Sequence, residues 1–134
     1  MTFYRLDTTA PELIAWGKKL SPNARLRIAR STAEWAFRRA GGDDDSLLTQ
    51  TNRDALVKIV EEYDIKYFDI YEANDDQFDD AGLALYWFRK ARAVESLLYA
   101  LSAKQEEFFF DALYEAQAAV GSVDELRAYL RTAV

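Results

Sequence analysis

Glycine and proline are scarce in this chain, and they fall where helices are expected to begin or end. Only five glycines and two prolines occur among 134 residues. Pro11 and Pro22 suit the first turn of a helix, whereas Gly41, Gly42 and Gly121 suit the positions just after a helix end. Between these residues, apolar side chains recur every three or four positions, which is the period of an α-helix. The pattern therefore predicts an all-α fold.

The helical pattern divides into six expected helices. Capping boxes of the form Ser/Thr-x-x-Glu/Gln indicate helix starts at Thr9, Ser102 and Ser122, and Ser21 is an expected N-cap before Pro22. Residues 65–71 fit a helical and an extended period alike, and a loop is expected to follow them at 72–77. The expected helices run from about 10 to 20, 22 to 40, 52 onwards, 78 to 101, 102 to 120, and 122 onwards.

The fourth expected helix has the pattern of a central helix. Its apolar side chains step by four and three residues, at Trp87, Ala91, Val94, Leu98 and Leu101. Half of all residues are hydrophobic, and a chain of this length has the size of one domain. We therefore expect residues 1–134 to form a single helical domain, an irregular bundle of about six helices.

One stretch, residues 61–80, concentrates both negative charge and aromatic side chains. It holds nine carboxylates and one base, Lys66, which gives a local net charge of −8 in a chain whose total is −6. Like charges at this density repel one another, so a cationic partner or a metal ion is expected to compensate them. The aromatic residues among the acids are Tyr63, Tyr67, Phe68, Tyr71 and Phe78. Because the acidity is local, it indicates a site rather than a general means of solubility.

Missing residue types and patterns exclude several functions. The chain has neither cysteine nor histidine, which removes disulfides, zinc–thiolate sites, thiol catalysis and the usual serine triad. The acidic stretch is the opposite of the basic footprint that nucleic acids require. No signal-peptide pattern and no apolar run near the roughly 20 residues of a membrane-spanning helix occur. We expect a cytoplasmic protein without a cofactor, nucleic-acid partner or membrane contact.

Two enzyme classes use carboxylates in strings similar to those of the acidic stretch. The string DDQFD at 75–79 matches the DDxxD motif with which prenyl-transferring enzymes hold magnesium and a diphosphate. Residues 61–64 and 72–75 look similar to the two acidic motifs of helical nucleotide pyrophosphohydrolases. For neither class does the sequence offer a second acidic motif on a suitably separated facing helix. We therefore expect that the protein is not an enzyme. The alternative is a magnesium-dependent phosphohydrolase that uses the acids of 61–79.

Two acidic groups outside this stretch have structural interpretations. Glu95 lies among apolar residues of the fourth expected helix, and Arg92, three residues earlier, is expected to pair with it. Asp111 and Glu115 are one helical turn apart, and both are expected to face solvent. Neither group is expected to be catalytic.

The last 55 residues carry a pattern of helix-packing residues, with Ala-Arg-Ala at 91–93 and Tyr-Glu-Ala at 114–116. In this pattern they resemble small all-helical immunity proteins of bacteria. Those proteins are cytoplasmic antidotes to contact-dependent growth-inhibition toxins and other polymorphic toxins. The resemblance implies a toxin inhibitor that is not itself an enzyme, and it transfers no defined functional residue to this chain.

The acidic stretch and the resemblance favour the same class of function, an acidic protein-binding module. Carboxylates and aromatic rings complement the basic cleft of a nuclease or another nucleic-acid enzyme. We expect an immunity or inhibitor protein, a monomer or weak homodimer, that masks the basic active site of a cognate toxin domain. A helical adaptor without either role is the third possibility. The expected contact residues are Asp64, Asp69, Tyr71, Glu72, Asp75, Asp76 and Asp79.

Overall fold

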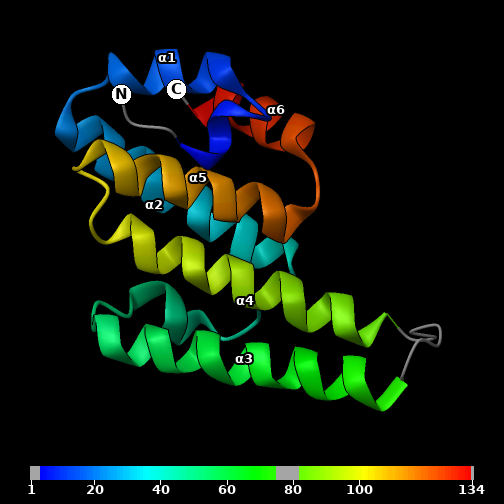
Figure 1. Cartoon of the computed structure of the whole chain (residues 1–134). Coiled ribbons are helices and arrows are strands. Elements are labelled where there is room, and N and C mark those ends of the chain that lie inside the picture. The colour runs from blue at the N-terminus through cyan, green and yellow to red at the C-terminus, as the bar shows by residue number, and fades with distance from the viewer. Residues whose placement is uncertain (1–3, 75–81, 134) are drawn as a thin grey trace.

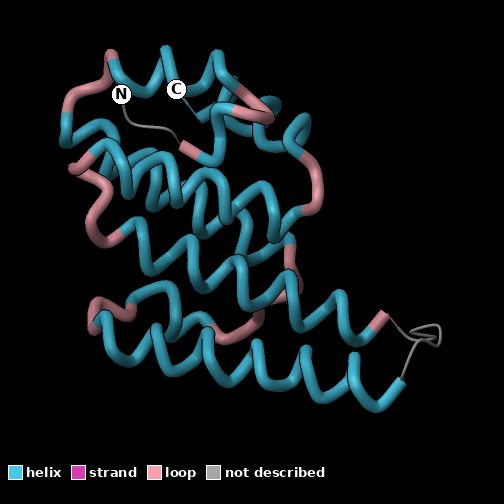
Figure 2. The backbone as a smooth tube through the Cα atoms, viewed as in Figure 1, coloured by secondary structure: helices cyan, strands magenta, loops and turns pink. Residues whose placement is uncertain are grey.

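The computed structural model describes residues 4–74 and 82–133, and every regular element in this part of the chain is helical (Figures 1 and 2). The α-helices are α1 (Pro11–Lys18), α2 (Pro22–Arg39), α3 (Arg53–Asn74), α4 (Leu83–Ala100), α5 (Glu106–Val120) and α6 (Val123–Ala133). Two short 3₁₀ helices, η1 (Arg5–Asp7) and η2 (Asp45–Thr49), precede α1 and α3. The described residues thus confirm the predicted all-α bundle of six helices.

The helices stack in layers, with α3 at one side of the bundle (Figure 1). α1, α6 and η1 lie at the opposite side, α2 and α5 come next, and α4 runs between these two helices and α3. α4 packs against α2, α3 and α5, whereas α4 is the only extensive neighbour of α3 among the described elements. One face of α3 is therefore buried on α4, and the opposite face is left to solvent.

The central position of α4 agrees with its predicted seam. Ala91 and Val94 are fully buried, and Leu98 is nearly so. On its α5 side, the hydroxyl of Ser96 donates a hydrogen bond of 2.8 Å to the backbone carbonyl of Ala112. Burial of α4 on several sides explains why its pattern was the clearest in the sequence.

Two of the three predicted capping boxes do not form. The N-cap of α1 is Ala10 rather than Thr9, and the N-cap of α5 is Gln105 rather than Ser102. Neither cap has a side chain that accepts a backbone hydrogen bond. Pro11 disfavours helical geometry in the residue before it, so α1 begins at the proline itself. Before α5, residues 101–105 form a turn instead of the first helical turn.

The remaining predicted caps are present. The hydroxyl oxygens of Ser21 and Ser122 accept hydrogen bonds from the backbone N–H groups of Ala24 and Glu125, each at 3.1 Å. Gly121 closes α5 with φ of +84°, a conformation that costs glycine little because it has no Cβ. These caps fix α2, α5 and α6 as the sequence predicted.

The predicted bounds of α3 and α4 need correction. Residues 65–74 are helical, so the loop predicted at 72–77 is wrong for 72–74, and 75–77 lie outside the described residues. Packing of Tyr67 on Phe88 of α4, with ring centroids 5.6 Å apart, supports this added length of α3. α4 begins at Leu83 rather than near Phe78, because Gly82 adopts a left-handed conformation with φ of +65°. Residues 78–81 lie outside the described part.

Gly17 allows α1 to approach two buried rings of α5, and this contact gives a stability prediction. A Cβ at Gly17 would lie 2.5 Å from Cε1 of Phe110 and 2.8 Å from Cε2 of Phe109. Gly17→Ala is therefore expected to destabilise the protein. Because both contacts are far shorter than van der Waals distance and involve buried rings, the overpacking cost is expected in the upper part of the range of about 1–3 kcal/mol. It then outweighs the helix-propensity gain of about 1 kcal/mol. Urea unfolding of this variant, measured beside the exposed-site control Ala15→Gly, tests the packing. A Gly17→Ala protein as stable as the wild type would contradict it.

Candidate functional site

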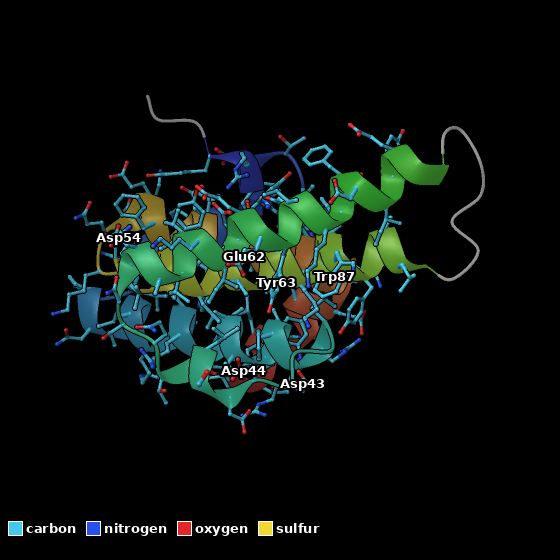
Figure 3. The ribbon with its side chains drawn as sticks, turned by 90° about the horizontal axis from the view of Figure 1, so that it is seen from below. Asp43, Asp44, Asp54, Glu62, Tyr63 and Trp87 are labelled. Carbon is cyan, nitrogen blue, oxygen red and sulfur yellow. The ribbon has the colours of Figure 1, made fainter. Side chains whose placement is uncertain are left out.

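Aromatic rings and cations hold α3 on α4. The rings of Tyr63 and Trp87 lie with centroids 5.3 Å apart (Figure 3). The ammonium of Lys90, on α4, is 5.0–5.2 Å from the ring centroids of Tyr63, Tyr86 and Trp87, and this side chain is only 7% exposed. Lys90 also donates a hydrogen bond of 3.2 Å to the hydroxyl of Tyr86. The positive charge of Lys90 is thus stabilised by ring faces and a hydroxyl.

Lys66, the single base of the acidic stretch, contacts the same indole ring. Its ammonium lies 4.3 Å from the centroid of Trp87. Trp87 is therefore approached by two lysines, Lys66 from α3 and Lys90 from its own helix. The cation of Lys66 is engaged at the α3–α4 interface, and no ion pair joins it to a described carboxylate.

Arg92 connects α3 to the interior of the bundle. Its guanidinium lies 3.2 Å from Asp64 on α3, 3.7 Å from Glu95 on α4 and 3.4 Å from Glu115 on α5. The predicted pair of Arg92 and Glu95 is confirmed. Because Arg92 also contacts Asp64 and Glu115, this one side chain joins α3, α4 and α5.

The expectation that Glu115 faces solvent is wrong. Its side chain is 2% exposed, and Nη1 of Arg5 lies 2.9 Å from Oε1 of Glu115. Burial raises the pKa of Glu115 above the usual 4.5, while the nearby charges of Arg92 and Arg5 oppose this rise. Asp111, one turn earlier, is closer to the surface and lies 3.4 Å from Arg5. A spacing of four residues does not distinguish a buried ion pair from a solvated one.

Three large apolar side chains are exposed along the C-terminal half of α3. Ile65 is 59% exposed, Phe68 is 56% exposed and Tyr71 is 63% exposed. They follow one another at three-residue intervals, so they form one ridge on the helix surface, which we call the apolar row. Exposed carboxylates lie along the same helix and form what we call the acidic flank: Glu61, Glu62, Asp69 and Glu72.

The apolar row is supported from below by a half-buried ring. The ring of Tyr67 lies 5.2 Å from that of Phe68, 6.0 Å from that of Tyr71 and 5.6 Å from that of Phe88 on α4. The row is therefore braced against α4 through Tyr67. Side chains braced in this way lose less conformational freedom when they bind a partner.

The predicted contact residues fall into three groups. Asp69, Tyr71 and Glu72 lie exposed on α3. The carboxylate of Asp64 is only partly exposed and is bound by Arg92, so in the free protein it joins α3 to α4. Asp75, Asp76 and Asp79 lie outside the described residues.

Sequence reasoning missed Ile65 and Phe68 as surface residues. At about 100° per residue, Ile65 falls on the side opposite Leu56 and Val60, which face the core, and Phe68 falls between the two sides. That signal becomes visible only once residues 65–71 are taken as helix. Because this segment fits a helical and an extended period alike, the sequence alone did not show which of its side chains face outward.

Acidic side chains extend beyond residues 61–80 on the underside of the molecule. In Figure 3, Asp54 and Glu62 lie along α3, and Asp43 and Asp44 lie in the loop that precedes η2. The carboxylate of Asp44 accepts hydrogen bonds from the N–H and hydroxyl of Ser46, at 3.1 and 2.6 Å, and so caps η2. The negative face of the protein is thus wider than the stretch singled out from the sequence.

Within residues 4–74 and 82–133, no three carboxylates converge closely enough to hold a metal ion. In the phosphohydrolase-like string at 61–64, the carboxylate of Asp64 is bound by Arg92. In the second string, at 72–75, Asp75 lies outside the described residues. None of the described helices is both long and apolar enough to cross a membrane.

Comparison with known proteins gives no relative from which a function transfers. No family model, curated protein or solved structure matches the chain. The resemblance of the last 55 residues to immunity proteins therefore stays an expectation from the sequence. The α3 surface itself supplies the remaining functional evidence.

The burial of Glu115 gives a pH-dependent prediction. Between 4.5 and its raised pKa, Glu115 holds more protons in the folded protein than in the unfolded chain. This difference makes wild-type stability fall as pH rises through that window, and glutamine at the same position removes the effect. Urea unfolding from pH 4 to 7 is expected to show wild-type stability declining relative to Glu115→Gln. Asp111→Asn, at a more exposed carboxylate, is the control. Parallel profiles for wild type and Glu115→Gln would contradict the raised pKa.

Proposed function

We propose that the exposed surface of α3 binds a basic partner protein. In this proposal the present chain is an inhibitor, an immunity protein that masks the active site of a toxin domain. The observation that carries the proposal is the apolar row, whose three side chains are each more than half exposed beside carboxylates. An exposed apolar patch with a polar rim is typical of a protein-binding surface. The resemblance of the last 55 residues to immunity proteins supports the same function.

The charge of the acidic flank favours a basic partner. None of Glu61, Glu62, Asp69 and Glu72 forms an ion pair with any described residue, so no salt bridge within that part of the chain neutralises their charges. A cationic partner would relieve the repulsion among these charges, and opposite charge would also speed its approach. Enzymes that act on nucleic acids have basic clefts because their substrate is a polyanion. The charge of the acidic flank therefore complements a nuclease-like toxin domain, which the protein would bind in the cytoplasm.

Charge reversal on the flank tests this proposal. Asp69→Lys/Glu72→Lys is expected to slow association with the partner by about tenfold or more at low salt, and the difference from wild type should shrink as salt screens the charges. The matched control is Glu107→Lys/Asp124→Lys, which makes the same change of charge on α5 and α6. Stopped-flow kinetics would use the C-terminal domain of the protein encoded by the gene that adjoins this one, with protection of growing cells as the second readout.

Two results would overturn the proposed function. The first is that this domain fails to bind the wild-type protein. The second is that the α3 reversal binds and protects as well as the wild type, which would make the flank a solvated face without a partner. Circular dichroism of both reversed proteins confirms that each variant is folded before it is compared.

A further inference from the structure

The shape of the apolar row specifies what kind of segment fits on it. Side chains three residues apart form a ridge that packs into the groove between the i, i+4 rows of a facing helix. At 1.5 Å of rise per residue, the row from Ile65 to Tyr71 is about 9 Å long, which is the contact length of nearly two helical turns. Tyr67 holds the rings of Phe68 and Tyr71 from beneath, so the ridge is formed before a partner arrives.

The carboxylates around the row specify the charge of that segment. Glu61 and Glu62 lie one turn before Ile65, while Asp69 and Glu72 lie one turn after Ile65 and Phe68 respectively. A segment seated on the row therefore meets negative charge near both ends of its apolar face. Lysine or arginine on the borders of that face would pair with these carboxylates.

We propose that the partner segment seated on the apolar row is a basic amphipathic helix. This inference rests on the proposed function and names the partner element that the same surface takes. A second copy of α3 fits poorly, because it would bring the same unpaired carboxylates together. An added strand needs a sheet edge, and the described residues contain no strand.

The row and the flank have separate kinetic roles in this complex. Burying Phe68 in an apolar groove removes its exposed surface from water, and the energy of that burial is lost only when the complex separates. Long-range attraction by the carboxylates acts while the partner approaches. The apolar row therefore sets the dissociation rate, and the acidic flank sets the association rate.

Two synthetic peptides of one composition test the inference. Both contain about 20 residues of lysine and leucine; one places the leucines on a single helical face, and the other has a scrambled order without such a face. Calorimetry and stopped-flow fluorescence would measure their binding to the wild type, to Phe68→Ala and to Leu85→Ala. Leu85 is the matched control, because it is 49% exposed on α4 and lies outside the row.

The inference predicts binding of the amphipathic peptide at least about tenfold tighter than binding of the scrambled one. Phe68→Ala should weaken it about tenfold through faster dissociation, and Leu85→Ala should leave it unchanged. Equal binding of the two peptides, or wild-type binding by Phe68→Ala, overturns the inference. A third result would also overturn the inference: sedimentation shows that the wild type is a dimer and that Phe68→Ala is a monomer. The row would then bind a second copy of the chain. Peptide binding as predicted, with no binding of the toxin domain, overturns the proposed function alone.

Discussion

The buried contact between Arg92 and Glu115 determines how α3 lies on the bundle. Glu115 is enclosed between α4, α5 and η1, and an enclosed carboxylate without cationic partners destabilises a fold by several kcal/mol. Arg5 meets it from η1 and Arg92 meets it from α4, so these contacts constrain the rotation of α4 relative to α5. The same guanidinium then binds Asp64, so the face of α3 that carries Asp64 must turn toward α4. Ile65, about 100° further round the helix, is left on the outside as a consequence.

The interface beneath that outer face is built to hold an acidic helix. Aliphatic packing is replaced over much of its length by rings and cations: Tyr63, Lys90 and Trp87 on the inner side, and Lys66 over the indole. Positive charge at this interface offsets part of the repulsion among the carboxylates of α3. The helix is thus kept in place while its outer carboxylates have no ion-pair partner among the described residues. This combination of a secured inner face and exposed carboxylates without salt bridges is what favours a binding role.

Sequence reasoning succeeded for interactions between residues close together in the chain and failed for interactions between remote residues. The helical period that places Ala91 and Val94 in one seam and the cap at Ser21 depend on neighbours within a turn or two, and these were predicted. The cap expected at Ser102 failed because a turn competes with the helix there. Glu115 was misread because its partners are remote: Arg5 is 110 positions earlier in the chain, and no periodicity reports such a contact. At the site, the acidity of α3 was evident, but the apolar row stayed hidden until the helix extended through 65–71.

The placement of α3 can be measured directly, because the chain has no cysteine and each engineered thiol would be the only one present. Cysteine introduced at Phe68 or Ile65 should react with a thiol reagent at the rate of an exposed thiol. Cysteine at Val60, which is buried on the inner face of the same helix, should react at least about tenfold more slowly, because reaction there requires local opening. Slow labelling at 65 and 68 together with fast labelling at 60 would mean that α3 is rotated. The apolar row would then be no surface for a partner.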